Sequence, residues 1–461
     1  MKSSEIHLVV LFLFRIFDYE SNSYNEKKSL KYILEKIQVQ FKSEALLNKF
    51  RYSETDFTRN KKLSFSTTLL IISNLIRKSL SLELVNFVDA FNRYGDRKMC
   101  SFTQSAFIQS RNKIKPEVFK QLSLTLITEF YSDNELSIKR WNGFRILAVD
   151  GSMINLPDTK ELETIYGRTK NQTKSGLIQA RTSVLYDVLN HLVIDSKLVT
   201  LGTGEIPLAK DHLLKAVKND LIIYDRGYPS FELVYLHNEM EVDFLFRVKS
   251  NFNNVVKAFI SSGKKSEIVE ISPGKNKARE SNLFTKKSTV KVRLISVTLD
   301  DGSIEILMTS LLNSLIYKNS IFKELYFKRW GVETYYDELK NKLKVEYFSG
   351  YSNNTILQDF NVAIFISNIQ TLIVNELEEE INIKTKERKL KYKVNSNLSY
   401  GFLKDRIIAL LLGSDDIENE LKALFKQHLI PIRPDRKNTR KYGKYKNRTK
   451  PKTYTNRKDS I

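Results

Sequence analysis

The sequence predicts an α/β protein with a helical N-terminal region and a basic C-terminal tail. Three observations predict this class. Up to about residue 134, apolar residues recur every three or four positions, as do Leu69, Ile72 and Ile76, which is the spacing of amphipathic helices. From residue 144 the pattern changes to short apolar runs separated by polar turns, which indicates strands. Long helical patterns return after residue 317, so helices and strands both contribute to the core.

The elements follow in chain order. The first strand-rich block has predicted strands at 144–149, 182–186, 192–199 and 221–224, with a helix over 206–218. A second block has predicted strands at 243–248, 267–271, 289–298 and 305–311, and a loop at 273–277. An uninterrupted helix is predicted over 317–343, and a further apolar helix over 356–377 leads into three glutamates.

The charge of the chain indicates a polyanionic partner. The 461 residues include 75 Lys and Arg against 53 Asp and Glu, a formal charge of +22. Nucleic acid is favoured because each cation placed on a phosphate releases a condensed counterion. An acidic membrane surface, or charge that serves only solubility, remains an alternative.

The tail from Arg433 onward concentrates this charge. It holds twelve basic residues against two aspartates, with Tyr442, Tyr445 and Tyr454 between them. Such a tail is expected to be disordered when free and to suit phosphate contact with some base stacking. A solubilising tail without any contact is the alternative.

The scarcity of sulfur and imidazole ligands restricts the metals that the protein can hold. Cys100 is the only cysteine, which excludes an intramolecular disulfide and argues against a thiolate zinc site. The five histidines are scattered without ligand spacing. A metal would therefore be held mainly by oxygen, which indicates a hard cation such as Mg²⁺.

The apolar stretch Leu8 to Phe14 superficially resembles a signal peptide. It is short, is followed by Arg15 and Asp18, and lacks a small-residue cleavage site, so a buried first helix is expected. No other run is expected to reach the roughly 20 residues of a membrane span. The sequence therefore predicts a cytoplasmic protein with no membrane partner.

Two short segments place an aspartate after an apolar strand. Asp150 follows Ile146–Val149 and precedes a glycine, and Asp225 follows Leu221–Tyr224 with Arg226 before the glycine. Strands that end in Asp would set carboxylates on the rim of a sheet, and adjacent strands lie ~4.8 Å apart, so the two could share metal ions. An Asx-turn that only caps its own backbone is the alternative for either one.

A stripe of polar residues marks the predicted helix 317–343. Arg329, Glu333 and Lys340 lie three, seven and fourteen positions after Tyr326, which places all four within ~60° on an ideal helix. One carboxylate, two cations and a hydroxyl suit a metal beside DNA phosphates. An ordinary solvated face with an Arg329–Glu333 pair is the alternative.

The spacing Tyr-x2-Arg-x3-Glu-x6-Lys resembles the signature of the insertion-sequence-4 family of DDE transposases. Asp150-Gly-Ser and Asp225-Arg-Gly-Tyr stand where the first and second catalytic aspartates of that family belong. The surrounding sequence is also similar, over roughly residues 65 to 380, in these segments: Ser105–Arg111, Leu307–Leu312, Glu324–Trp330, Phe348–Gly350 and Leu357–Phe360.

The resemblance implies a ribonuclease-H-like α/β core interrupted by a β-rich insertion. It implies that Asp150, Asp225 and Glu333 are the catalytic metal ligands for two Mg²⁺ ions, with Mn²⁺ able to substitute. It also implies that the remaining residues of the stripe hold the DNA backbone around a flipped nucleotide: Tyr326, Arg329 and Lys340. Trp330 is expected either to stack on nearby bases or to pack the helix.

The resemblance further implies cut-and-paste transposition through strand nicking, hairpin formation and strand transfer. The partners would be double-stranded DNA of the terminal inverted repeats and of the target, bound by a homodimer in the bacterial cytoplasm at the nucleoid. A nuclease that never joins strands, and a catalytically silent DNA-binding descendant, are the alternatives.

The expected domains are a helical DNA-binding region (1–135), a first core part (140–241), the β-rich insertion (242–312), a second core part (313–385), and a C-terminal helical region with the tail (386–461).

Overall fold

The computed structural model describes residues 30–59, 61–96, 98–132, 138–169, 176–414 and 416–433. The predicted first helix at Leu8–Phe14 and the tail beyond Arg433 lie outside these ranges. The described chain is a mixed α/β protein that divides into two compact units. One unit comprises Val217–Tyr326, and the other comprises the described residues before Val217 and after Tyr326.

The larger unit begins with helices whose starts follow ordinary capping chemistry. Side chains of Ser43, Ser64 and Thr103 each accept a hydrogen bond from a backbone N–H in the first helical turn that follows. The helices of this region are α2 (Leu30–Phe41), α3 (Glu44–Phe50), α4 (Phe65–Ser73), α5 (Leu80–Tyr94), α6 (Gln104–Arg111) and α7 (Val118–Tyr131).

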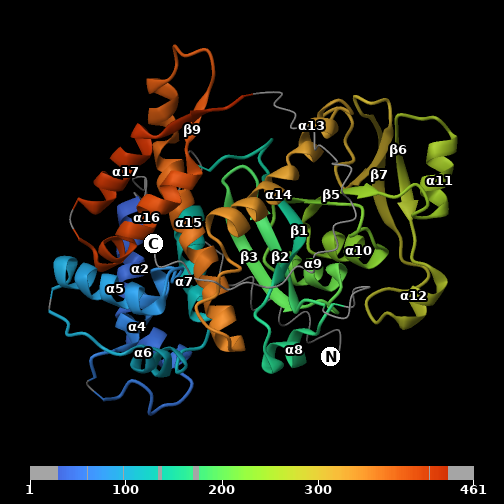
Figure 1. Cartoon of the computed structure of the whole chain (residues 1–461). Helices are drawn as coiled ribbons and strands as arrows, with labels where there is room; N and C mark the ends of the chain where they lie inside the picture. Colours follow the sequence, from blue (N-terminus) through green and yellow to red (C-terminus); the bar gives the residue numbers. More distant parts are fainter. Residues whose placement is uncertain are drawn as a thin grey trace, which may run out of the picture. The chain divides into compact units, whose positions relative to one another are not determined.

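Three antiparallel strands follow in the same unit (Figure 1). They are β1 (Arg145–Asn155), β2 (Gln179–Asp187) and β3 (Leu192–Thr200), accompanied by α8 (Lys160–Tyr166) and α9 (Glu205–Leu213). In β1 the first five residues are buried, and exposure begins at Asp150. The predicted end of this strand at Val149 is therefore wrong, because pairing with β2 carries β1 on to Asn155.

The long helix α15 (Asn353–Lys384) forms the centre of this unit and packs on β3, α7, α4 and α17. It is long and apolar enough to cross a membrane, contrary to the expectation that no segment is, but 89% of its most apolar window is buried inside the protein. Its apolar character is that of a core helix. The remaining elements are α14 (Trp330–Asp337), η1 (Glu338–Lys342), β9 (Tyr392–Val394), α16 (Ser396–Leu412), α17 (Ile417–Gln427) and β10 (Leu429–Pro431).

The smaller unit is built on five strands in the order β4-β5-β8-β7-β6. β4 and β5 are parallel and the other pairs are antiparallel. The elements are β4 (Asp220–Tyr224), α10 (Phe231–Glu239), β5 (Asp243–Val248), α11 (Asn254–Ser261), β6 (Ser266–Ile271), α12 (Lys275–Glu280), β7 (Val290–Thr298), β8 (Ile304–Thr309) and α13 (Ile321–Phe327). The loop predicted at 273–277 thus leads into a short helix, and β5, placed in the predicted insertion, pairs with β4 of the predicted core.

The predicted uninterrupted helix 317–343 is wrong. It consists of α13, α14 and the π-helical turn η1. Between α13 and α14, the N–H groups of Gly331 and Val332 donate to the carbonyls three residues earlier, so this turn of the helix is narrower than an α-helical turn. Arg329 keeps right-handed helical angles. At the other end the N–H of Leu343 reaches the carbonyl of Glu338, the wider spacing of a π-turn. The four stripe residues are therefore not held on one regular helix.

Candidate active site

Asp150 lies where β1 leaves the core, and its main chain is held from two sides. The Tyr336 hydroxyl of α14 donates to the Asp150 carbonyl at 2.8 Å, and the Ser183 hydroxyl of β2 donates to it at 3.4 Å. The neighbouring Tyr335 stacks on Tyr186 of β2 with ring centroids 5.0 Å apart. The two tyrosines fix α14 against the strands, so the Asp150 side chain stands on a rigid support.

Arg329 connects Asp150 with Glu333. Its Nη2 donates to Glu333 Oε1 at 2.8 Å, and its Nη1 lies 3.7 Å from Asp150 Oδ2. The guanidinium is buried with 4% of its side chain exposed, whereas Asp150 and Glu333 keep 22% and 37% exposed. One buried cation therefore gathers two carboxylates that remain open to solvent.

Lys340 and Trp330 border this cluster. Lys340 Nζ donates to the hydroxyl of Ser152, two residues after Asp150 on β1, at 2.6 Å. Burial lowers the pKa of Lys340, and the Glu346 carboxylate opposes this shift. The Trp330 ring lies against Arg329 at 5.2 Å from its guanidinium carbon and remains 48% exposed.

A chain of hydrogen bonds runs from the Asp150 carbonyl of β1 to Asp195 of β3. The Ser183 hydroxyl is 3.0 Å from His212 Nε2, and His212 Nδ1 is 2.9 Å from Asp195 Oδ2. Ser183 and His212 are buried. Burial raises the pKa of Asp195, but the hydrogen bond from His212 and the charges of His212, Lys197 and Lys120 outweigh it, so the pKa lies below its ordinary value. The buried serine and histidine position the strand and have no access to a substrate.

The smaller unit holds Asp225 in a second cluster. Asp225 directly follows β4, as the sequence predicted. Its Oδ1 accepts hydrogen bonds from Arg247 Nε at 2.9 Å and from the Tyr326 hydroxyl at 3.1 Å. Arg247 Nη2 lies 2.6 Å from the same oxygen, and Arg247 also pairs with Glu305. Tyr326 is buried, with 7% of its surface exposed, so its hydroxyl bonds to Asp225 in the protein interior.

The residue before Asp225 anchors the end of β4. Tyr224 stacks on Phe246 of β5 with centroids 4.6 Å apart, and its hydroxyl bonds to His237 Nε2 of α10 at 2.9 Å. Burial lowers the pKa of His237 to about 4, so its ring is neutral at neutral pH. The residue directly before Asp225 is therefore fixed by aromatic packing and a hydrogen bond.

The predicted site residues thus fall into two clusters. Asp150, Glu333, Arg329, Trp330 and Lys340 belong to the larger unit, and Asp225 and Tyr326 to the smaller one. Within the described residues, no group of three or more His, Cys, Asp or Glu side chains is arranged to hold a metal ion. Each predicted metal ligand is instead balanced by an arginine in this structure.

Several residues of these clusters carried no signal in the sequence: Tyr336, Ser183, His212 and Glu305. Arg247, which lies in the predicted strand 243–248, proves to be the partner of Asp225. The acids near Glu333 on the chain are engaged locally, since Asp337 accepts from Asn341 and Glu338 pairs with Lys342.

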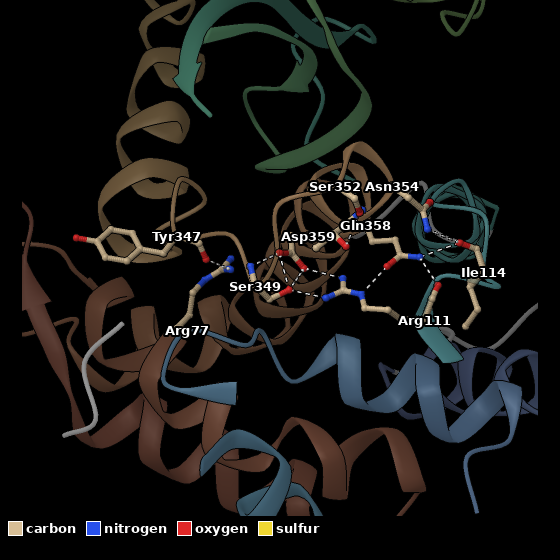
Figure 2. A network of polar contacts seen from close by, with 10 residues as sticks. Arg77, Arg111, Ile114, Tyr347, Ser349, Ser352, Asn354, Gln358 and Asp359 are labelled. Carbon is tan, nitrogen blue, oxygen red and sulfur yellow. Dashed lines mark hydrogen bonds and ion pairs between the residues drawn. The ribbon is translucent and has the colours of Figure 1, made fainter. Parts of the chain in front are cut away.

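A second network joins the flanking segments of the sequence (Figure 2). Arg111 of α6 donates to Gln358 and Ser349, and it forms an ion pair of 3.1 Å with Asp359. Gln358 in turn donates to the carbonyls of Arg111 and Ile114. The segment 105–111 therefore meets two segments from much later in the chain, 348–350 and 357–360, in one buried polar contact.

Comparisons with known proteins show similarity to transposases. Residues 141–369 match the family model described as "Transposase DDE domain", an interval that includes every residue of both clusters. "Transposase InsG for insertion sequence element IS4" of Escherichia coli (strain K12) is 24% identical over 278 residues, which are 59% of this chain and 60% of that relative. The chain thus spans about three fifths of the relative's length.

One solved structure shows a weaker similarity. The "Cryo-EM structure of piggyBac transposase synaptic complex with hairpin DNA (SNHP)" aligns with 88% of this chain and 87% of its own, at 11% identity and a TM-score of 0.40, which is too low to establish a shared fold. The family model and the InsG relative carry the assignment: this chain belongs to the DDE transposase family, in the insertion-sequence-4 group.

Proposed function

We propose that this protein is a DNA transposase that cuts an insertion sequence from DNA and joins it to a target. The observation that carries the proposal is the Asp150–Arg329–Glu333 cluster, within a segment that matches the transposase DDE domain. The core would be ribonuclease-H-like. The larger unit would supply the antiparallel strands β1 to β3 to this core, and the smaller unit the parallel pair β4–β5.

The donor set fits a hard divalent cation. Asp150, Asp225 and Glu333 offer only carboxylate oxygens, the ligands that Mg²⁺ and Mn²⁺ prefer, and all three keep part of the side chain exposed. When bound, two such ions supply an activated nucleophile and neutralise charge on the reacting phosphate.

The protein's own residues would hold these carboxylates and the DNA. Arg329 and Arg247 fix the orientation of Glu333 and Asp225, and Tyr336 fixes the backbone of Asp150. Lys340, beside β1, would contact a DNA phosphate, and the exposed Trp330 ring would stack on a base near the transposon end. Tyr326 would act through Asp225, because its hydroxyl is already bonded there.

Three finer points belong to the same proposal. Strand nicking would free a 3′ hydroxyl that forms a hairpin on the element's end, and the reopened end would then be joined to the target. Two ends must be cut together, so a homodimer is expected on paired inverted repeats. The working place would be the cytoplasm at the nucleoid, and the strands β6 to β8 would form the insertion in the core.

The test is cleavage and strand transfer by purified protein on DNA carrying the element's inverted repeats, which sequencing of the coding region's flanks would identify. Asp150→Asn is expected to lower the nicking rate in Mg²⁺ by about a thousandfold, equivalent to ~4 kcal/mol. Asp158→Asn is the matched control, since Asp158 is an exposed carboxylate paired with Arg168 in the same unit.

Full cleavage by Asp150→Asn would show that the metal-site assignment is wrong. Cleavage without strand transfer by the wild-type protein would identify a nuclease, and DNA binding without cleavage would identify a silent descendant.

A further inference from the structure

A basic cavity lies in the larger unit, on the side of the strands that faces α7. It has a volume of about 350 Å³ and is lined by residues of α3, α7, β3 and α15. Four lysines contribute to its wall, Lys49, Lys120, Lys197 and Lys215, against the two carboxylates of Glu117 and Asp195. The cavity therefore carries a surplus of positive charge.

Lys120 combines partial burial with the lack of a close partner among the described residues. Its ammonium makes no hydrogen bond or ion pair within the described ranges, although the side chain is half-buried. Burial lowers the pKa of Lys120; Asp195 and Glu117 raise it, and Lys197 and Lys215 lower it. A cation withdrawn from water without a close counterion is unfavourable, and an anion bound in the cavity would remove that cost.

Neither carboxylate of the wall forms an ion pair with Lys120 within the described part of the chain. The Asp195 carboxylate is engaged by His212 at 2.9 Å and lies 3.9 Å from Lys197. Glu117, just before α7, is exposed. Asp195 and the buried His212 thus form a closed pair, which leaves the Lys120 ammonium for a ligand.

The remaining lysines extend the positive surface outward. Lys49 and Lys215 are exposed, and Lys197 is half-buried with its ammonium 3.6 Å from Asp211. Two exposed cations beside two partly buried ones suit a chain of phosphates that continues past the cavity better than an isolated ion.

The cavity is distinct from the cluster around Asp150. Asp195 pairs with Leu185 on β2, and the neighbouring Val184 pairs with Asp150 on β1. Two strand spacings, about 10 Å, therefore separate the two places within the sheet. A ligand in the cavity would not occupy the position of the reacting phosphate.

We propose that this cavity binds a backbone phosphate of DNA, as an anchoring subsite separate from the catalytic carboxylates. The inference rests on the proposed action on DNA. The chemistry shared with a free phosphate ion is recognition of a phosphate group by lysine ammonium groups, and the two sources are separated by the test.

The first measurement needs no variant. Lysines of the full chain are reductively methylated in a brief pulse, alone, with a DNA duplex, or with inorganic phosphate, and labelling is read by mass spectrometry. Lys120 labelling is expected to fall severalfold with DNA, while that of Lys426, which pairs with Glu380, stays unchanged.

The second measurement uses Lys120→Met, which keeps the aliphatic length without the charge. The slope of log affinity against log salt for DNA is expected to decrease in magnitude by about 1, the loss of one phosphate contact. Lys426→Met removes the same charge from the same unit and is expected to leave the slope unchanged.

DNA binding with unaltered Lys120 labelling and an unaltered slope would overturn the inference and leave the proposed function standing. Protection of Lys120 by inorganic phosphate but not by DNA would overturn the assignment to DNA. Absence of any DNA binding by the wild-type protein would overturn both proposals.

Discussion

Arg111 and Arg329 are both buried in the larger unit and both contact carboxylates, with 3% and 4% of their side chains exposed. Their partners differ. Asp359, the partner of Arg111, is 5% exposed, whereas Asp150 and Glu333 beside Arg329 are 22% and 37% exposed. Arg111 closes a contact that no ligand can reach, and Arg329 holds carboxylates that a ligand can reach. The exposure of the carboxylate, rather than of the arginine, separates a structural ion pair from a candidate catalytic one.

The largest expected effect is on the closed network of Figure 2. Arg111→Ala would leave Asp359 buried without its charge partner and remove the bonds to Gln358 and Ser349. A loss of about 3–5 kcal/mol in the free energy of unfolding is expected, measured by urea denaturation. Nicking activity per folded molecule should survive. A fully stable Arg111→Ala protein would contradict the structural role.

Arg329→Lys is expected to distinguish the candidate catalytic ion pair of Arg329 from the structural ion pair of Arg111. A lysine cannot reach Asp150 and Glu333 together as the fork of a guanidinium does. We expect a loss of about 1–2 kcal/mol in stability and about a tenfold to hundredfold loss in the single-turnover nicking rate.

The matched variant is Arg111→Lys, which should lower stability to a similar extent without slowing the nicking of folded protein. Equal losses of activity in both variants would mean that burial alone, and not the exposed carboxylates, explains the effect.

The smallest expected effect concerns Glu83, another buried carboxylate of the larger unit. Burial raises its pKa, but the ammonium of Lys404 and the backbone N–H groups of Lys78 and Arg77 outweigh burial, so the pKa lies below its ordinary value. Its stabilising contribution is therefore present above the unfolded pKa of about 4.3 and is lost as the pH falls through the lower folded value.

The free energy of unfolding, measured from neutral pH down to about pH 3, should accordingly fall less steeply with acid in Glu83→Gln than in the wild-type protein. Parallel curves for the two proteins would remove Glu83 from the acid response.

Much of the fold was predictable because local patterns determine local structure. The strand β5 was predicted with its observed bounds, and β2, β3, β6, β7 and β8 within a few residues, since alternating or continuous apolar runs need only their neighbours to form. The continuation of β1 past Asp150 was not predictable, because pairing with β2 maintains it where the apolar run has ended.

The division of 317–343 was hidden for a similar reason. No proline lies within this segment. Its irregular turns coincide with contacts to distant residues, such as the hydrogen bonds from Arg77 to the carbonyls of Leu343 and Tyr347. The prediction that Tyr326, Arg329, Glu333 and Lys340 lie on one regular helix was therefore wrong.

The sequence by itself determined the chemical inventory: a basic chain with one cysteine, aspartates beside apolar strands, and the spacing of Tyr326, Arg329, Glu333 and Lys340. Only the tertiary structure decided which cation balances which carboxylate, that Tyr326 bonds to Asp225, and that Lys120 is half-buried without an acceptor in the described residues. The reason is physical. Residue types and periodicity act along the chain, whereas burial and ion pairing depend on side chains that only folding brings together.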